Sequence, residues 1–338
     1  MMSPMSSPPH MADTQFWSGR NVLVGGGCGF WGSYVVAQLA AAGARVAVID
    51  NLESGRLDRV PPAHGVEFIE GDLRDAGTCA RAVQGRDIVI NLAARASGME
   101  YSSTHHGEML VQNLLCGLTP LEAARNAGVE RYAIMSSSCV YPDDAPIPTP
   151  ELDAFTRRPE RVNEGYGWAK RIQELAGTYY ARESGMKMTI VRPVNLYGGN
   201  YRWESSEKAH VIPLLVKRVL DGEDPVVVWG SGDQRRYFMH GSDASAMLLR
   251  LIERGAGPEP VNIGFDDDTR IRDLVELICD VSGRRPRIVY DTSKPEGQFR
   301  KCVDPSRLLE LTGGMRPTIS LRDGIAEMID WHARSFHS

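Results

Sequence analysis

The sequence predicts an α/β fold in which helices cover both faces of a doubly wound parallel sheet, with a smaller, mainly helical lobe after it. Short runs rich in Val and Ile alternate along the chain with longer stretches in which Ala and Leu recur at helical spacing. The runs are apolar on both faces, which is typical of strands in a parallel sheet buried between helices. A turn with several glycines directly after the first run indicates that the sheet begins with a strand–turn–helix unit.

Six apolar runs account for most strands of the predicted sheet, and they alternate with helical stretches such as 34–43 and 119–128. The strands are expected within NVLVGGG (21–27), RVAVIDN (45–51), VEFIEGDL (66–73), DIVINLAA (87–94), RYAIMSSS (131–138) and MTIVRPVN (188–195). After about Asn195, helical stretches are joined by loops rich in Gly, Pro and charge, and one further strand at 260–264 is expected to return to the sheet. We therefore predict a disordered tail at 1–16, a sheet domain at 17–195 and 237–265, and a smaller lobe at 196–236 and 266–338.

The composition favours chemistry on small molecules over binding to nucleic acid or membranes. Among 338 residues, 38 Lys and Arg stand against 43 Asp and Glu, and a net charge of -5 provides no basic field for a polyanion. No apolar run reaches membrane-spanning length, and the Ser- and Pro-rich N-terminus lacks the features of a signal peptide. The 6 cysteines form no C-x-x-C pair, so neither a metal site nor a disulfide framework is expected, and a cytoplasmic location is predicted.

A glycine motif at the first strand–helix turn predicts a Rossmann-type dinucleotide-binding domain. Gly26, Gly29 and Gly32 form G-x-x-G-x-x-G at the start of a helix, where glycines let the backbone approach a pyrophosphate. Asp50 ends the second strand, where its carboxylate is expected to accept hydrogen bonds from ribose hydroxyls and to repel a 2′-phosphate. This favours NAD over NADP as the cofactor.

Further cofactor contacts are expected where later strands end along the same crevice. Asp72 and the segment 91–94 are placed near adenine and pyrophosphate respectively, although Asp72 equally suits a cap at the end of its strand. The additional predicted contacts are Phe30, Asn51, Asp72, Leu73, Leu92, Ala93, Ala94 and Pro193.

A tyrosine–lysine pair is the first candidate for catalysis. Tyr166 and Lys170 form Y-x-x-x-K in a helical stretch, and the i, i+4 spacing places the phenol and the ammonium on one face. The ammonium is expected to lower the pKa of the phenol from about 10 towards neutrality, which makes the phenolate a usable base for an alcohol. Ser137 or Ser138, at the end of a strand, is expected to supply a hydroxyl to the same oxygen.

With these motifs, the chain resembles the extended short-chain dehydrogenase/reductase family of nucleotide-sugar epimerases and dehydratases, from Asn21 to about Trp331. The resemblance implies that Ser137, Tyr166 and Lys170 are catalytic, that hydride passes between the sugar and NAD, and that two chains pair through a four-helix interface. NLAARASGMEY, SSSCVYP and NLYGGNYRW are similar to segments of GDP-mannose 3,5-epimerases. HVIPLLVKR, VWGSG and DTSKPEGQFRK are also similar to segments of GDP-fucose synthases.

The same resemblance gives Cys139 a chemical role, because both groups of enzymes place a cysteine two residues after the catalytic serine. A ketone at C4 acidifies the hydrogens at C3 and C5, and a thiol with an ordinary pKa near 8.5 suits proton transfer at these carbons. Inversion needs a second acid or base on the opposite face. Lys208 matches the mannose epimerases by letter and His210 matches the fucose synthases, and of the two we favour His210.

Substrate contacts are implied in the same way. Arg236 matches an arginine near the sugar diphosphate, where its planar donors suit phosphate oxygens, while its neighbour Arg235 is expected to be a surface charge. The predicted substrate contacts are Ser137, Asn195, Lys208, Arg236 and Arg300.

The resemblance and these residues predict a GDP-mannose 3,5-epimerase, or 5-epimerase, that oxidises C4 with bound NAD, inverts C3 and C5 through an enolate and then reduces C4 again. The alternatives are an epimerase-reductase of the GDP-fucose synthase type, a simple 4-epimerase, and a dinucleotide-sensing protein without catalysis. Asp50 argues against the NADPH-consuming reductase, and Cys139 argues against the simple 4-epimerase. The expected partners are a GDP-hexose and a second copy of the chain, with no metal, nucleic acid or membrane.

Overall fold

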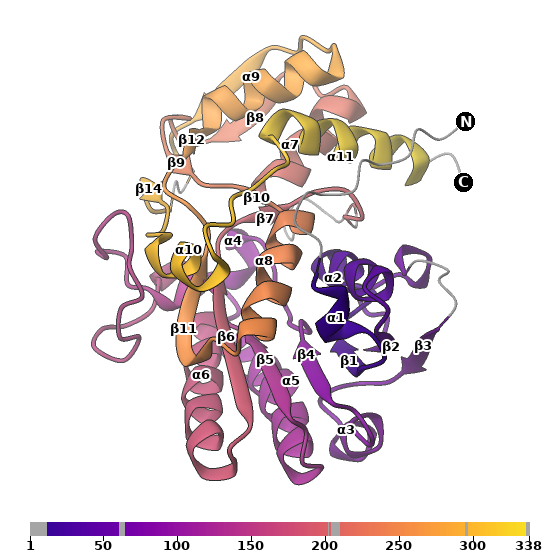
Figure 1. Ribbon diagram of the computed structural model, residues 1–338. Helices are drawn as coiled ribbons and strands as arrows, with labels where there is room; N and C mark the ends of the chain where they lie inside the picture. The colour runs from indigo at the N-terminus through magenta and orange to yellow at the C-terminus, as the bar shows by residue number, and fades with distance from the viewer. Residues whose placement is uncertain (1–11, 61–64, 202, 204–209, 295–296, 336–338) are drawn as a thin grey trace.

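The structure, a computed structural model, describes residues 12–60, 65–201, 203, 210–294 and 297–335. Its centre is a sheet of parallel strands in the order β11-β6-β5-β4-β1-β2-β3 (Figure 1). These strands are β1 (Asn21–Gly25), β2 (Arg45–Asp50), β3 (Val66–Glu70), β4 (Ile88–Asn91), β5 (Arg131–Met135), β6 (Lys187–Pro193) and β11 (Gly257–Ile263). The chain reverses its direction of winding between β1 and β4, which is where doubly wound sheets bind ligands at their carboxyl edge. The predicted fold class is confirmed.

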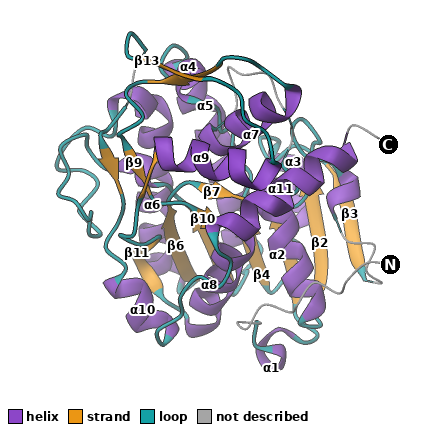
Figure 2. Ribbon diagram, turned by 90° about the horizontal axis from the view of Figure 1, so that it is seen from above, coloured by secondary structure: helices purple, strands orange, loops and turns teal. Residues whose placement is uncertain are grey.

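Helices cover both faces of the sheet, as Figures 1 and 2 show. One face carries α2 (Phe30–Ala41) and α8 (Gly241–Arg254), and the other carries α3 (Ala76–Ala82), α5 (His106–Asn126) and α6 (Glu164–Ser184). Along β1, Val22 and Val24 belong to the first core and Leu23 to the second, because successive side chains point to opposite faces. Both faces are buried, which explains why the strands are apolar throughout.

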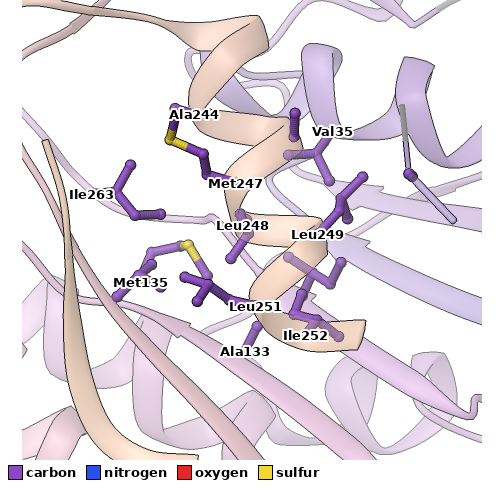
Figure 3. Close-up of a cluster of buried hydrophobic side chains, with 14 of the residues drawn as sticks. Val35, Ala133, Met135, Ala244, Met247, Leu248, Leu249, Leu251, Ile252 and Ile263 are labelled. Atoms are coloured by element: carbon purple, nitrogen blue, oxygen red, sulfur yellow. The ribbon is translucent and has the colours of Figure 1, made fainter. Parts of the chain in front are cut away.

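Figure 3 shows the core between α8 and the sheet. Met247, Leu248 and Leu251 of α8 lie against Met135 of β5 and Ile263 of β11, and none of these side chains is more than 5% exposed. Burying a side chain of this size contributes roughly 1.5–3 kcal/mol. The cluster therefore anchors β11 to the sheet, and the predicted return of the chain at 260–264 is confirmed.

A smaller lobe lies over one end of the sheet in Figure 1 and has its own apolar core. Its helices α7 (Val211–Asp221), α9 (Ile271–Ser282) and α11 (Leu321–Ser335) surround the paired strands β8 (Val226–Trp229) and β13 (Ile288–Asp291). Short strands link the two parts: β7 (Leu196–Tyr197) with β10 (Met239–His240), and β12 (Thr269–Arg270), β9 (Arg235–Arg236) and β14 (Arg300–Lys301). Within the segment assigned to the smaller lobe, α10 (Ser306–Thr312) packs instead on α8 and β11. None of the described helices has the length and apolar character that crossing a membrane requires.

The described chain forms structure before the predicted end of the tail. α1 (Thr14–Trp17) follows Asp13, whose carboxylate accepts the N–H of Gln15 as an N-cap. The Trp17 side chain is fully buried, and its Nε1 donates to Glu253 of α8 at 2.5 Å. The prediction of a disordered tail is therefore wrong for residues 12–16, because the partner that anchors them is far away in the sequence. Residues 1–11 lie outside the described part of the chain.

A buried ion pair joins α6 to the sheet. Arg192 of β6 donates from Nε and Nη2 to the Glu174 carboxylate at 2.9 and 2.6 Å, and the two side chains are 2% and 7% exposed. Arg192 also donates to Tyr141 Oη at 3.1 Å and to the Leu152 carbonyl oxygen at 2.8 Å. This network fixes the helix that carries the predicted tyrosine–lysine pair.

Replacing Arg192 with Met is expected to lower the free energy of unfolding by about 3–5 kcal/mol, because the Glu174 carboxylate stays buried without its cation. The double variant Arg192→Met/Glu174→Leu removes both charges and is expected to recover much of that loss. Urea unfolding followed by circular dichroism measures both. A double variant no more stable than the single one would contradict this account of the pair.

Candidate functional site

An open groove runs along the carboxyl ends of β1 to β4, the edge at which doubly wound sheets bind their ligands. Nine of the predicted cofactor contacts line it: Gly26, Gly29, Asp50, Asn51, Asp72, Leu73, Leu92, Ala93 and Ala94. The parallel sheet brings these residues together because their four strands end at the same edge.

The glycine turn between β1 and α2 is too crowded for larger residues. A Cβ on Gly32 would lie 2.2 Å from the Gly26 carbonyl oxygen, and one on Gly26, whose φ is +71°, would lie 2.9 Å from the Ala93 backbone. Gly29 is the N-cap of α2 and makes no side-chain cap, so the first amides of the helix are not taken by a capping side chain. Such a turn is the cradle that a pyrophosphate needs at a helix N-terminus.

Asp50 lies at the end of β2 and is only 8% exposed. Its carboxylate accepts the N–H of Cys28 at 3.0 Å and the N–H of Leu52 at 2.9 Å. Burial raises the pKa of Asp50, and these two hydrogen bonds reduce the effect. The backbone thus fixes a carboxylate in the groove lining, where ribose hydroxyls can reach it.

A network of charges continues along the groove from Asp72. The Nε of Arg74 donates to both carboxylate oxygens at 2.9 and 3.0 Å, and this bond is the main reason that the pKa of Asp72 falls to about 2. Asp72 also accepts the backbone N–H of Arg74, so it caps its strand end while it lines the groove. Glu53 pairs with Arg74 and Arg95 at 3.7 and 2.8 Å. The sequence analysis missed these three residues because loop charges follow no periodic pattern.

Of the other predicted cofactor contacts, Gly32 belongs to the glycine turn, Tyr166 and Lys170 belong to α6, and Phe30 and Pro193 lie elsewhere than in the groove lining. Phe30 begins α2, and its ring packs 5.8 Å from that of Tyr34 and 5.9 Å from that of Tyr201. Pro193 ends β6, where it pairs in register with Ile263. Their contact with a cofactor remains a prediction.

Ser137 and Cys139 lie directly after β5. Cys139 belongs to the 3₁₀ turn η2 (Ser138–Val140). Ser137 is the N-cap of this turn, and its Oγ accepts the N–H of Cys139 at 3.1 Å. Ser137 and Cys139 are partly exposed, whereas Ser138 is buried. Of the two candidate serines, Ser137 therefore offers its hydroxyl to a ligand.

Tyr166 reaches the same region from the first turn of α6, where glycines on either side allow close packing. A Cβ on Gly165 would lie 2.0 Å from the His106 carbonyl oxygen, and one on Gly167 would lie 2.7 Å from that of Cys139. Helix α6 thus approaches both α5 and η2. This packing brings Tyr166 near enough to the Cys139 thiol for their charges to interact.

Lys170 lies one turn after Tyr166, with its Nζ 5.4 Å from the centroid of the phenol ring. It is 2% exposed, and it donates to Gln173, whose Nε2 donates in turn to the Asn113 carbonyl oxygen of α5. Burial lowers the pKa of Lys170 to about 8. Burial, together with the Cys139 charge, raises the pKa of Tyr166, so the expected lowering is wrong for the protein alone. Desolvation outweighs the attraction of the ammonium at this separation.

Lys301 and Glu160 form a buried cluster with Cys139 that the sequence analysis missed. The Nζ of Lys301 lies 3.7 Å from the Cys139 Sγ and 2.8 Å from Glu160 Oε2, and the two charged side chains are 12% and 6% exposed. Burial raises the pKa of Cys139 to about 11, and the Lys301 charge opposes this rise. A cation therefore faces the thiol inside the candidate site.

The alternation of side chains along β9 and β14 explains why Lys301, and not Arg300, belongs to this cluster. The strands pair in parallel, with Arg300 opposite Arg235 and Lys301 opposite Arg236. Arg235 and Arg300 both bind the buried Asp268 carboxylate, the former at 2.5 Å. Lys301 and Arg236 therefore share the other face. Asp268 thus pairs with both arginines, so Arg235 is more than a surface charge, and the role of Arg300 as a substrate contact remains a prediction.

The remaining predicted residues come from the entry to the smaller lobe. His210 is the N-cap of α7, its backbone N–H donates to Tyr201 Oη at 3.4 Å, and desolvation lowers the pKa of its imidazole. Lys208 lies outside the described residues. Asn195 follows β6 with a φ of +35°, and its Nδ2 donates to the Tyr237 carbonyl oxygen at 3.0 Å. Such strain in a residue other than glycine concentrates at functional sites, so Asn195 remains a candidate substrate contact.

The residues present fit a nicotinamide dinucleotide, since the crowded glycine turn, the groove and the Asp50 carboxylate match its pyrophosphate and ribose. When bound, such a cofactor exchanges a hydride with a substrate carbon. Two side chains of the site, the Tyr166 phenol and the Cys139 thiol, have the chemistry that proton transfer requires. In the part of the chain that the structure describes, no three or more His, Cys, Asp or Glu side chains are grouped to hold a metal ion.

Known proteins resemble this chain in sequence over most of its length. The model of the NAD dependent epimerase/dehydratase family matches residues 22–264. GDP-L-fucose synthase 1 of Arabidopsis thaliana is 35% identical over 251 residues, which cover 73% of this chain and 77% of that protein. The dTDP-4-dehydro-6-deoxy-D-allose reductase of Streptomyces bikiniensis is 32% identical over 325 residues, which cover 93% of this chain and 97% of that protein.

The fold also matches solved structures. UDP-glucose 4-epimerase from Thermotoga maritima, with UDP-glucose, has a TM-score of 0.84 at 28% identity, and the match covers 94% of this chain and 100% of that chain. The glycine turn and the residues Ser137, Tyr166 and Lys170 all fall inside the segment that the family model matches. The chain is therefore an enzyme that belongs to the NAD dependent epimerase/dehydratase family.

Proposed function

We propose that the enzyme is a nucleotide-sugar epimerase-reductase of the GDP-fucose synthase type. Its substrate would be a 4-keto-6-deoxyhexose linked to a nucleoside diphosphate, which we assign as GDP. On this sugar the enzyme would invert C3 and C5 and reduce the C4 ketone. The observation that carries the proposal is the Cys139 thiol beside Ser137 and Tyr166, because neither a plain reductase nor a 4-epimerase needs a thiol there. GDP-L-fucose synthases from Arabidopsis and Escherichia coli, at 35% and 33% identity, support this choice over the GDP-mannose 3,5-epimerase favoured from the sequence.

The thiol acts at carbon in this proposal. The Cys139 thiolate takes the proton from C3 or C5, an S–H bond forms, and the C–H electron pair moves into the C4 carbonyl as an enolate. His210, in our assignment, returns a proton to the opposite face, which inverts the carbon and restores the ketone. Two different groups are needed because the proton leaves from one face and returns to the other.

The phenol acts at oxygen. Tyr166 gives its proton to the C4 oxygen when the ketone is reduced, and the Ser137 hydroxyl donates a hydrogen bond to the same oxygen. The raised pKa of Tyr166 suits this direction, because the phenol is protonated at neutral pH and can act as an acid. Lys170, with a pKa of about 8, is largely charged at pH 7 and stabilises the phenolate that results.

A second candidate, GDP-mannose 3,5-epimerase, is favoured by one observation. The buried Asp50 carboxylate suits an unphosphorylated ribose, and hence NAD, which an epimerase can keep through a cycle without net redox change. The two candidates differ in whether reduced cofactor is consumed.

The test supplies purified enzyme with GDP-4-keto-6-deoxymannose and NADH or NADPH, and follows absorbance at 340 nm while the sugar products are separated. We expect one reduced cofactor to be consumed for each sugar nucleotide converted. Isomerisation of GDP-mannose without added or consumed reduced cofactor would overturn the proposal in favour of the second candidate. Parallel reactions with the UDP- and dTDP-linked 4-keto sugars test the guanine assignment.

We propose NAD(H) as the cofactor, and Asp50→Ala is expected to relax the preference. Loss of hydrogen bonds to ribose should weaken NADH binding by about 1–3 kcal/mol, while removal of the negative charge should tighten NADPH binding. Dissociation constants for NADH and NADPH measure both effects. The control is Asp58→Ala, which removes an exposed carboxylate paired with Arg56 in the following loop. Preferential binding of NADPH by the wild-type enzyme would contradict the assignment.

We also propose a homodimer, because α5 and α6 pack side by side and leave an apolar face uncovered. On α5, Val111 and Leu115 are 50% and 42% exposed, and on α6, Ile172 and Tyr179 are 37% and 49% exposed. Sedimentation equilibrium at micromolar concentration is expected to give twice the chain mass of 37.3 kDa, and Leu115→Asp is expected to shift the protein to the monomer. A wild-type monomer would contradict the prediction.

A further inference from the structure

Three side chains from separate segments meet beside the candidate reaction centre. Cys139 lies in η2, Glu160 lies just before the 3₁₀ turn η3 (Arg161–Asn163), and Lys301 lies on β14. The Lys301 Nζ is 3.7 Å from the Cys139 Sγ and donates to Glu160 Oε2 at 2.8 Å. The lysine is therefore held between a carboxylate and a thiol.

Glu160 is itself fixed in place. The Nδ2 of Asn163 donates to Glu160 Oε2 at 3.0 Å. The backbone N–H of Glu160 donates to the Cys139 carbonyl oxygen at 3.3 Å. Burial would raise the pKa of Glu160, but the charge of Lys301 and the hydrogen bonds that Glu160 accepts together outweigh it, and the pKa falls to about 2. The pKa of Lys301 is raised, because the Cys139 and Glu160 charges together outweigh the opposing effect of burial. Both charges of the Lys301–Glu160 ion pair are therefore present at neutral pH.

The groups that face this cluster come from η2, from α6 and from β9. Ser137 Oγ binds the Cys139 backbone from the same turn, and the Tyr166 phenol approaches the thiol from α6. Arg236, opposite Lys301 on β9, adds a second positive charge near the lysine. Among these described groups, Lys301 is the cation for which a direct contact with the sulfur is seen.

We propose that Lys301, held by Glu160, is the positioning residue that places a positive charge against the Cys139 sulfur and so stabilises the thiolate that removes a proton from carbon. This inference deepens the proposed function and rests on it. The thiol first gives its proton to solvent, and Lys301 keeps all of its protons. When the thiolate takes a proton from C3 or C5, the S–H bond forms again and the negative charge moves to the enolate oxygen. Glu160 prevents the lysine from turning away from the sulfur.

The test measures alkylation of Cys139 by iodoacetamide between pH 7 and 10.5, with the peptide that contains Cys139 quantified by mass spectrometry. The thiolate is the species that reacts, so the rate reports its fraction. Lys301→Met is expected to lower the rate at pH 8.5 by at least tenfold, since an opposite charge this close shifts a pKa by about 1–3 units. Glu160→Gln is expected to raise the rate, because its amide oxygen can still accept from Lys301 while the negative charge nearest to the thiol is removed.

Lys301→Arg keeps the charge and is expected to retain the wild-type pH profile. Lys187→Met, which breaks an exposed pair with Glu130 at the far end of β6, serves as the matched control and should also leave the profile unchanged. If Lys301→Met does not fold, the faster labelling expected of Glu160→Gln and the unchanged profile expected of Lys301→Arg still decide.

Faster labelling in both Lys301→Met and Glu160→Gln would show that the pair only packs over the sulfur, and it would overturn the inference. An unchanged profile in both would overturn it as well. No substrate is present in this experiment, so its result stands whether or not the enzyme proves to be an epimerase-reductase.

Discussion

Replacing Tyr166 with Phe is expected to abolish reduction of the C4 ketone, the largest effect that a single substitution should have on this enzyme. The phenol would be the acid that protonates the C4 oxygen, and such a group contributes about 10²–10⁴ in rate even where water can substitute for it. In this enclosed site, between α6 and η2, the loss should reach the upper end of that range. Consumption of NADH with GDP-4-keto-6-deoxymannose measures it.

The same variant separates the two halves of the chemistry. Because the proposed substrate already carries its ketone, Tyr166→Phe should still exchange the hydrogens at C3 and C5 with solvent. Tyr179→Phe, which removes only a hydroxyl on the face of the same helix proposed for pairing, is the matched control and should reduce the ketone at the wild-type rate. Undiminished reduction by Tyr166→Phe would contradict the role assigned to the phenol.

Replacing Cys139 with Ala is expected to slow proton exchange at C3 and C5 by about 10²–10⁴, while reduction of the ketone continues. The thiol acts at carbon and the phenol at oxygen, so the variant should release a reduced sugar whose C3 and C5 are not inverted. Proton NMR of the product formed in heavy water measures both carbons. Cys279→Ala, in the core of the smaller lobe, controls for the loss of a thiol elsewhere.

His210→Asn and Lys208→Met belong in the same series, because these two residues are the candidates for the second acid or base. Loss of inversion in His210→Asn with normal behaviour of Lys208→Met is the expected result. If Cys139→Ala exchanges these hydrogens as fast as the wild type, the thiol is only packing, and the enzyme is better described as a reductase.

The fold could be predicted from the sequence because a buried parallel sheet leaves a repeated local signal. The central strands had to be apolar on both faces, as Val22, Leu23 and Val24 show, and β1, β3, β4 and β5 are each followed by an α-helix before the next strand of the sheet. The glycine turn could also be predicted, since Gly32 is required by a contact with Gly26 only six residues away.

Contacts between distant segments could not be predicted in the same way. Trp17 is held by Glu253, so the neighbouring residues did not reveal that the segment after residue 11 is anchored to the domain. Lys301 faces Cys139 only because β14 pairs with β9, a pairing of two residues that leaves no periodic signal. Arg300 was predicted as a substrate contact and Lys301 was not singled out, because only the register between those strands decides which of the two neighbours faces the thiol. Likewise, the pKa of Tyr166 depends on how deeply α6 is buried, which the i, i+4 spacing does not reveal.

The central claim is that one site inverts carbons beside a ketone and then reduces that ketone. Its most direct test is proton NMR of the sugar nucleotide recovered from heavy water after wild-type enzyme has acted on GDP-4-keto-6-deoxymannose with NADH. The account predicts a product reduced at C4 that carries solvent deuterium at both C3 and C5. A product reduced at C4 with its original hydrogens at C3 and C5 would contradict it.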